Sequence, residues 1–119
     1  MNRMQQITIG AGAAVLGALS AAALAHHGWS GYETQIRKVT GTIEDPSYSN
    51  PHASIRLKAS DKTWVVVLAP PSRMSSRGLT ADMLKVGASA SVEGYQSMSN
   101  VSEMRAERIS LNGKTVELR

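Results

Sequence analysis

Three histidines are the side chains of this sequence best suited to bind a metal ion. His26 and His27 are adjacent and follow an apolar run, whereas His52 follows a proline further along the chain. The run ends in Ala23-Leu24-Ala25, the small-x-small pattern after which a signal peptidase cuts. Cleavage there would leave His26 as the N-terminal residue, so that a free α-amine would lie beside two imidazoles. Such nitrogen ligands suit copper, which heads the affinity series of the divalent first-row metals.

The arrangement expected from these ligands is a three-nitrogen, T-shaped set known as a histidine brace. His26 would chelate the ion through its amine and its ring, His52 would be the distant ligand, and His27 could replace either one. Pro51 would fix the backbone before His52 and so help to hold the ring in place. Copper is the expected cofactor, and zinc is disfavoured because no fourth ligand lies near in the sequence. The alternative is that His26 and His27 form a solvated start and that His52 closes a turn.

Residues 1–25 resemble an export signal, and residues 26–119 are expected to form a single β-barrel domain. Residues 7–25 are apolar and rich in Ala and Gly, and Arg3 supplies a weak positive start. An uncleaved membrane anchor is the alternative, because the run is nearly long enough to span a bilayer. With cleavage, the protein would be periplasmic or secreted and soluble. The chain has no cysteine, so its core must suffice without a disulfide.

The elements that would position the histidines are mostly strands. Alternating residues predict a strand from Gln35, bent at Gly41. Turn signals stand at residues 45–47 and 49–51, and the pair Asn112-Gly113 is the strongest hairpin signal of the chain. Further strands are predicted at residues 53–58, 63–68, 89–95, from about Met104, and around Val116 and Leu118. A helical region is predicted between residues 72 and 86, with Thr80 as a possible N-cap.

The predicted order is three strands, one short helix and two or three strands. A long first strand bent at a glycine, with the helix between strands three and four, is typical of the OB-fold, a small and partly open Greek-key barrel. We therefore predict a mainly β protein with an OB-like barrel of five to six strands. A small β-sandwich is the alternative.

A second predicted site would bind a ligand without a metal. Trp64 could stack a sugar or a base, and Arg56 and Lys58 could attract an anion, as strands two and three of OB-folds often do. Trp29 and Tyr32 are expected to pin the start of the domain or to shield the histidines. The alternative is that these charges only solvate the outer faces of strands. The net charge of +4 is too small to indicate nucleic acid.

The sequence offers little sign of an enzyme. It contains no GxSxG or HExxH motif and no glycine-rich phosphate loop, and no pair of carboxylates is spaced for acid–base work. Catalysis would depend on an open position at the copper ion. We therefore predict a carrier, chaperone or sensor of copper, or alternatively a metal-free module for an anionic or carbohydrate ligand or a protein partner.

Several motifs, in a fixed order, resemble an uncharacterised family of small exported bacterial proteins. These motifs are AHHGWSGY, NPHA, WVVVLAPPSR, RGL, LKVGASASVEGY and MRAERI. The resemblance spans residues 26 to about 118, and the HHGW and NPH motifs carry it most specifically. It implies a small exported β-barrel, and it makes His26, His27, Trp29, Pro51 and His52 the natural candidates for the function. It implies no activity and no substrate.

Overall fold

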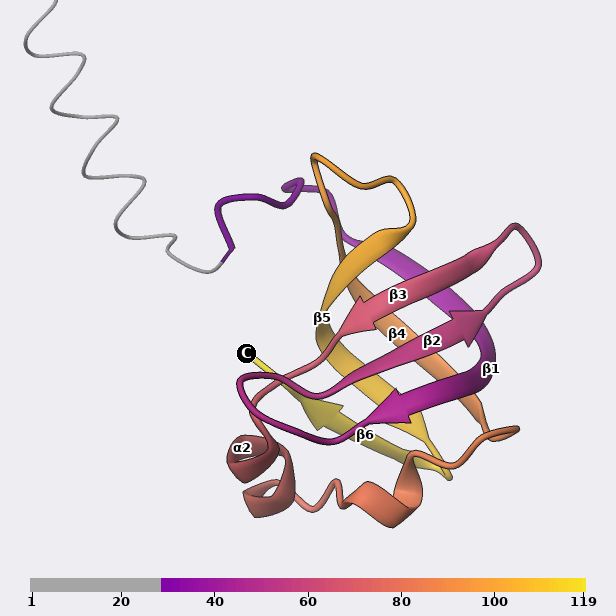
Figure 1. Cartoon of the computed structure of the whole chain (residues 1–119), viewed down its shortest axis with the longest axis vertical. Helices are drawn as coiled ribbons and strands as arrows, with labels where there is room; N and C mark the ends of the chain where they lie inside the picture. The colour runs from indigo at the N-terminus through magenta and orange to yellow at the C-terminus, as the bar shows by residue number, and fades with distance from the viewer. Residues whose placement is uncertain (1–28) are drawn as a thin grey trace, which may run out of the picture. The chain divides into compact units, whose positions relative to one another are not determined.

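The strands of this protein are described in a computed structural model that covers residues 29–119 (Figure 1). The chain divides into two units, residues 1–30 and residues 31–119, and the strands described below lie in the second. The predicted leader and the predicted ligands His26 and His27 lie outside the described residues. The strands are β1 (Arg37–Ser47), β2 (Ser54–Lys58), β3 (Thr63–Val67), β4 (Ser89–Gln96), β5 (Glu103–Leu111) and β6 (Lys114–Glu117).

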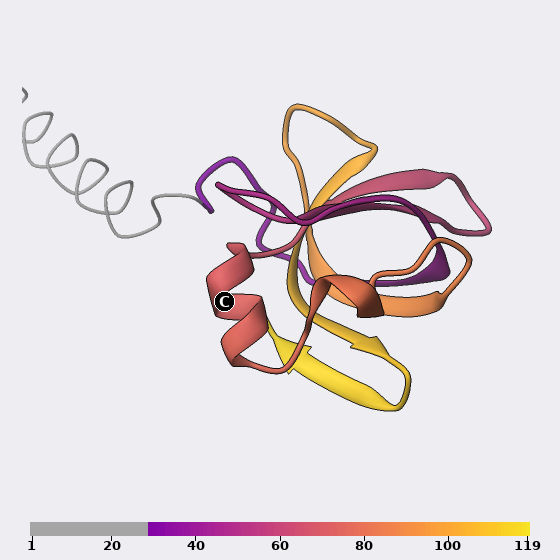
Figure 2. The same cartoon turned by 60° about the horizontal axis from the view of Figure 1, so that its bottom comes forward.

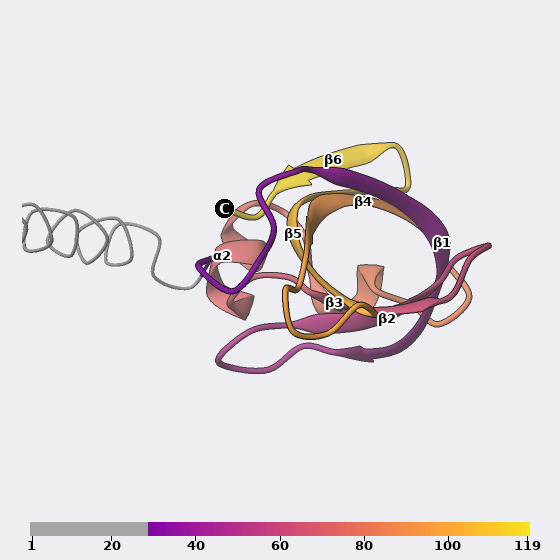
Figure 3. The ribbon, with the colours of Figure 1, turned by 90° about the horizontal axis from the view of Figure 1, so that it is seen from above.

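The strand pairing closes the sheet into a barrel. The strand order is β3-β2-β1-β4-β5-β6 with antiparallel neighbours, and a parallel pairing of β3 with β5 completes the ring. β6 pairs with β5 and lies outside the ring, as the view from above shows (Figure 3). The structure thus confirms the predicted mainly β, OB-like barrel with five strands and one more. Closure leaves few free strand edges in a short chain.

β1 is long because it takes part in two pairings. Its first half, from Arg37 to Thr42, pairs with β4, and its second half, from Thr42 to Ser47, pairs with β2. Gly41 lies where the partner changes, and a Cβ atom there would be 2.4 Å from the backbone oxygen of Lys58. The predicted bend at a glycine therefore lies where two backbones approach too closely for a side chain.

The turn predicted at residues 45–47 was wrong. β1 continues through these residues to Ser47, and its register against β2 shifts between Glu44 and Ser47. Asp45 has a φ of 43°, a left-handed conformation that aspartate tolerates better than most residues. The Asp-Pro signal thus marks an irregularity within the strand, because the strand pairing on both sides overrides the local preference for a turn.

The predicted helical region is divided into two short pieces. α2 (Pro71–Ser76) is an α-helix, and a 3-10 turn follows at Ala81–Met83. Gly78, with a φ of 85°, separates them. Thr80 precedes the 3-10 turn, as an N-cap residue would, but its side chain makes no capping hydrogen bond to the backbone there.

α2 is tied to the end of the last strand. The Arg73 side chain donates to the Leu118 carbonyl oxygen at 3.0 Å, and the Arg77 side chain donates to the Glu117 carbonyl oxygen at 2.7 Å. These bonds hold the helix beside β6, where Figure 2 shows the two together. The position of the helix between strands three and four was predicted, whereas these contacts were not.

The inward-facing side chains of all the strands form one core. Ile43, Leu57, Trp64, Val66 and Met104 are among its fully buried members. Each strand alternates these residues with exposed or half-buried ones, as a barrel requires. None of the helices between residues 29 and 119 is long and apolar enough to cross a membrane.

Candidate functional site

His52 lies in the loop before β2, with its ring against a side chain of β5. Its Nε2 atom is 3.3 Å from the Nη2 atom of Arg105, and its side chain is half-buried. Burial lowers the pKa of the His52 imidazole below its usual value, and the charges of Arg105 and Arg73 lower it further. The neutral imidazole is therefore favoured over the imidazolium. Because a guanidinium can only donate, Nε2 is the acceptor of this contact.

Tyr32 ties the start of the domain to the same strand. Its hydroxyl donates to the Glu103 carboxylate at 2.7 Å. Burial, the hydrogen bond to Glu103 and the charge of Glu103 together raise the pKa of Tyr32 to about 12, because each favours the neutral phenol, and the charge of Arg105 opposes part of the rise. Tyr32 also forms a β-bridge with Ser97, beside a backbone hydrogen bond of 2.9 Å from Met98 to Gly31. The predicted role of Tyr32 in pinning the lead-in segment is thus confirmed.

The outer face of β5 brings these two contacts together. Glu103 and Arg105 alternate along the strand with the buried residues Met104 and Ala106, so their side chains share one face. They stand two residues apart, about 7 Å along a strand. Glu103 accepts the hydrogen bond from Tyr32, and Arg105 contacts His52. This cluster of Tyr32, His52, Glu103 and Arg105 is called the β5 polar cluster below.

The β5 polar cluster does not by itself supply a metal site. Among residues 29–119, no three His, Cys, Asp or Glu side chains are grouped closely enough to hold an ion. His52 is the one predicted metal ligand within the described chain. The sequence predicts its other two nitrogen partners at residues 26 and 27.

The residues predicted to bind a ligand without a metal are dispersed. Trp64 is 2% exposed and belongs to the core, and the Lys62 ammonium lies 4.2 Å from the centroid of its ring. Arg56 is exposed on β2, opposite Glu44 of β1. Trp29 is half-buried in the first unit of the chain. A ligand could stack on Trp64 only after Lys62 had moved.

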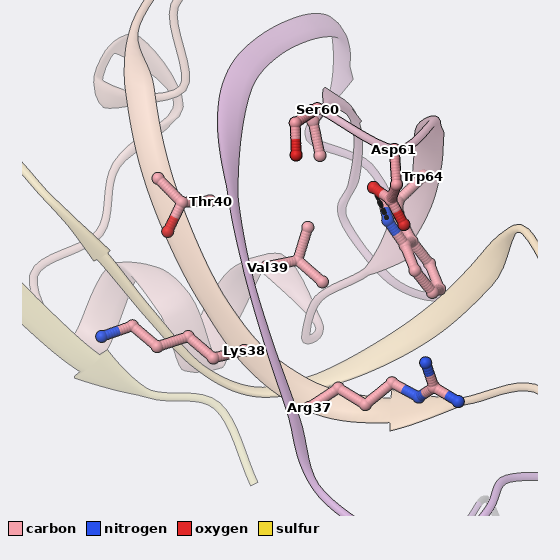
Figure 4. A pocket seen from close by; sticks show the side chains of 8 residues that line it. Arg37, Lys38, Val39, Thr40, Ser60, Asp61 and Trp64 are labelled. Carbon is pink, nitrogen blue, oxygen red and sulfur yellow. Dashed lines mark hydrogen bonds between the residues drawn. The ribbon is translucent and has the colours of Figure 1, made fainter.

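An open cleft of about 360 Å³ lies beside Trp64 (Figure 4). Its walls are the first half of β1 and the turn between β2 and β3. The Asp61 carboxylate accepts a hydrogen bond of 3.4 Å from the indole of Trp64 and one of 2.9 Å from the backbone of Lys62. The residues lining the cleft are Arg37, Lys38, Val39, Thr40, Ala59, Ser60, Asp61 and Trp64.

The sequence analysis missed residues of the β5 polar cluster and of the cleft beside Trp64. Glu103 was not predicted to be a site residue, and Arg105 was expected only as one of several cations that could attract an anion. The alternation in MRAER nevertheless signals that the two share an outward face. The cations of the cleft are Arg37 and Lys38, rather than the predicted Arg56 and Lys58. The sequence predicted that these four cations lie on strands. Which of the strands borders the cleft depends on how the barrel closes.

The fold defines a small closed β-barrel of the OB type. Residues 14–105 match the Family of unknown function (DUF6152), and the chain belongs to that family. This agrees with the resemblance to an uncharacterised family. No curated protein matches the chain.

Solved structures are similar to this chain at low sequence identity, and the one with a TM-score above 0.5 shares its fold. One is a crystal structure of the ZRD-deleted mutant of TiaS in complex with agmatine, with 13% identity and a TM-score of 0.53 over 71% of this chain. Another is a complex of TiaS with a tRNA and ATP, with 17% identity and a TM-score of 0.47 over 71% of this chain. This chain spans 26% and 19% of the length of those two chains. The likeness concerns the fold alone.

Proposed function

We propose that this protein is exported, that removal of residues 1–25 frees the amine of His26, and that the mature protein binds copper. The ligands are His26, His27 and His52. The protein acts as a carrier, chaperone or sensor of the ion in the periplasm or outside the cell. The observation that supports this proposal most is the β5 polar cluster, because His52 and Tyr32 contact neighbouring side chains on the same face of β5.

The length of the chain before the cluster limits how far His27 can lie from Gly31. Four peptide units separate His27 from Gly31, and an extended chain of that length spans at most about 14 Å. Gly31 accepts a hydrogen bond from Met98. Tyr32 binds Glu103 on the face of β5 that also carries Arg105, and Arg105 contacts His52. Metal–nitrogen bonds are near 2 Å long, so the nitrogen atoms of His26 and His27 must come within a few ångströms of the His52 ring.

Arg105 competes with a metal ion for the Nε2 atom of His52. Its guanidinium occupies the Nε2 lone pair of His52, so an ion that binds there must displace it. Removing the guanidinium should therefore preserve or strengthen copper binding through His52. If His52 serves only to support Arg105, its loss should leave copper binding unchanged.

The test is a Cu(II) titration of protein that begins at His26. It is compared with His52→Ala and with a variant that keeps one extra residue before His26. We expect each change to weaken binding by at least about tenfold, the equivalent of about 1.4 kcal/mol. Ser49→Ala, in the same loop and exposed, is the matched control and should bind like the parent. Arg105→Gln should bind at least as tightly as the parent. Equal affinity of the parent, His52→Ala and the extended variant would overturn the proposal.

A module that binds its ligand without a metal is the second candidate. The observation that favours it is the open cleft beside Trp64, whose walls carry Arg37 and Lys38. An anionic ligand would meet two cations there and one carboxylate, Asp61, which already accepts two hydrogen bonds.

A further inference from the structure

The first half of β1 has a free edge. β2 pairs with β1 from Thr42 onward and ends at Lys58, so before Thr42 the described strands pair with β1 on the β4 side alone. Antiparallel strands direct the backbone groups of successive residues alternately to either side. Ile43 donates its N–H on the β4 side, to Ala88. The alternation therefore turns the N–H and C=O groups of Lys38 and Thr40 toward the free edge.

The cleft lies along this edge. Four consecutive residues of β1, Arg37 to Thr40, line it, whereas a pocket on one face of a strand would be lined by every second residue. Figure 4 shows Lys38 and Thr40 extending to one side of β1, and Val39 extending toward the side of Ser60, Asp61 and Trp64. The other wall of the cleft is the turn that follows β2.

We propose that this edge of β1 binds an extended, acidic peptide segment of a partner protein as an added strand. The backbone groups of Lys38 and Thr40 supply the ladder hydrogen bonds, as in other cases of strand addition. The residues of β1 at this edge allow about four positions of pairing, or about 13 Å of strand. This inference names a ligand for the second candidate function and does not depend on copper.

The charges around the cleft select the side chains of the peptide. Arg37 and Lys38 are exposed on its wall, and the exposed Lys58 stands at the end of β2 beside it. Arg37 also forms an exposed ion pair of 3.7 Å with Glu33, which contributes little and can exchange for a peptide carboxylate. Val39 and Ala59, both half-buried, offer a small apolar contact between the charges. Because Lys38 and Val39 extend to opposite sides of β1, a peptide in which acidic and small apolar residues alternate can direct its acidic side chains toward Lys38 and its apolar ones toward Val39 and Ala59.

The outer edge of β6 is another free edge within residues 29–119, and it fits such a peptide less well. The carbonyl oxygen of Glu117 already accepts a hydrogen bond from Arg77. The Glu117 carboxylate is exposed and would repel an acidic peptide. The cleft and the cations therefore both favour β1.

The test is a titration of the ¹⁵N-labelled full chain with the acetylated, amidated peptide Asp-Val-Asp-Val-Asp. We expect amide shift changes centred on residues 37–40 and 59–61. A peptide with Lys in place of Asp, and one with N-methylated backbone amides, should each bind at least about tenfold more weakly, since the first reverses the charges and the second removes ladder donors. Equal binding of all three peptides, or shift changes confined to β6, would overturn the proposal.

Substitutions in the protein test the same edge of β1 independently of changes in the peptide. Thr40→Pro removes the N–H at the edge while sparing the ladder to β4, and should weaken binding about tenfold, with Thr40→Val as its control. Arg37→Glu should weaken binding by a similar factor, about tenfold, whereas Lys114→Glu, an exposed cation on β6, should change it less than about twofold. Arg37→Glu keeps the test decisive if Thr40→Pro fails to fold. Unchanged binding by Arg37→Glu would refute the role of the cleft. None of these outcomes alters the copper titration, so the two proposals can fail separately.

Discussion

Arg105 joins residues that are far apart in the sequence. It contacts His52, which is 53 residues away, and stands two positions from Glu103, which binds Tyr32 across 71 residues. Burial lowers the pKa of Arg105, but an arginine stays charged in proteins. Its positive charge therefore persists beside a neutral imidazole, and any cation that reaches His52 must compete with it.

Tyr32 allows a test of the β5 polar cluster by pH. Its phenol is favoured over the phenolate in the folded protein, with a pKa of about 12. The stability that it contributes is thus fully present below pH 10, the pKa of an unperturbed tyrosine, and is lost as the pH rises toward 12. Tyr32→Phe should lower the free energy of unfolding by about 1 kcal/mol at pH 7, because it removes a half-exposed bond to a charged acceptor.

Two measurements check this prediction. The ultraviolet absorbance of tyrosinate should show one late-titrating group fewer in Tyr32→Phe than in the parent. Tyr95, whose pKa burial also raises, titrates late in both proteins. Urea denaturation at pH 7 gives the difference in stability. A Tyr32→Phe protein that retains the same late titration would contradict the assignment.

At the scale of elements, the junction of β4 and β5 shapes the face that carries the cluster. The register between them shifts next to Gly94, so that Glu93 opposes Arg108 and Gly94 opposes Ala106. A bulge of this kind re-aims the side chains that follow it. Beyond it, the Arg108 side chain binds Glu117 at 2.8 Å and lies 3.4 Å from Glu93, which links three neighbouring strands.

Gly94→Ala should disrupt this junction. A Cβ atom at Gly94 would lie 2.1 Å from the backbone oxygen of Arg105, so one of the two strands must shift. We expect a loss of about 2–3 kcal/mol in the free energy of unfolding, as for other overpacked sites. Gly31→Ala, where a Cβ atom would meet nothing within 4 Å, is the control and should stay within about 0.5 kcal/mol. Urea denaturation measures both, and similar values for the two variants would contradict the close contact.

At the scale of the molecule, the barrel is stabilised by its core and by closure through β5. Met104 is fully buried on that strand, opposite Val66 of β3 and Gln96 of β4. The point where the ring closes therefore depends on one flexible apolar side chain, which can fill an irregular gap. The chain has no cysteine, so no disulfide reinforces this closure.

Met104→Ala should destabilise the whole barrel. The cavity should lower the free energy of unfolding by about 2–5 kcal/mol, and each kcal/mol should lower the melting temperature by roughly 4–8 °C. Met98→Ala is the matched control, because Met98 is 71% exposed in the β4–β5 loop, and it should change stability by less than about 0.5 kcal/mol. Thermal unfolding followed by circular dichroism compares them, and an equal effect of the two would contradict the packing described for β5.

Local patterns predicted most of the strands, and tertiary contacts explain the exceptions. The alternation of residues 53–58 and 63–68 matches β2 and β3 within a residue. Asp45-Pro46 was predicted to be a turn, but pairing with β2 keeps it in a strand. Trp64 was expected on a binding surface, yet its position on β3 turns it into the core. Alternation shows which residues share a face, but it cannot show which face is inside.

The amino-acid sequence alone determined the order of strands and helix along the chain, the glycine at which the first strand bends and the residue types able to bind a metal. These features depend on neighbours along the chain. Tertiary structure decided that Arg105 lies against His52, that Tyr32 binds Glu103 on the same strand face, and that Arg37 and Lys38 border the cleft. Such contacts join residues many positions apart, and they depend on how the strands pair in the barrel, which neighbours along the chain do not show.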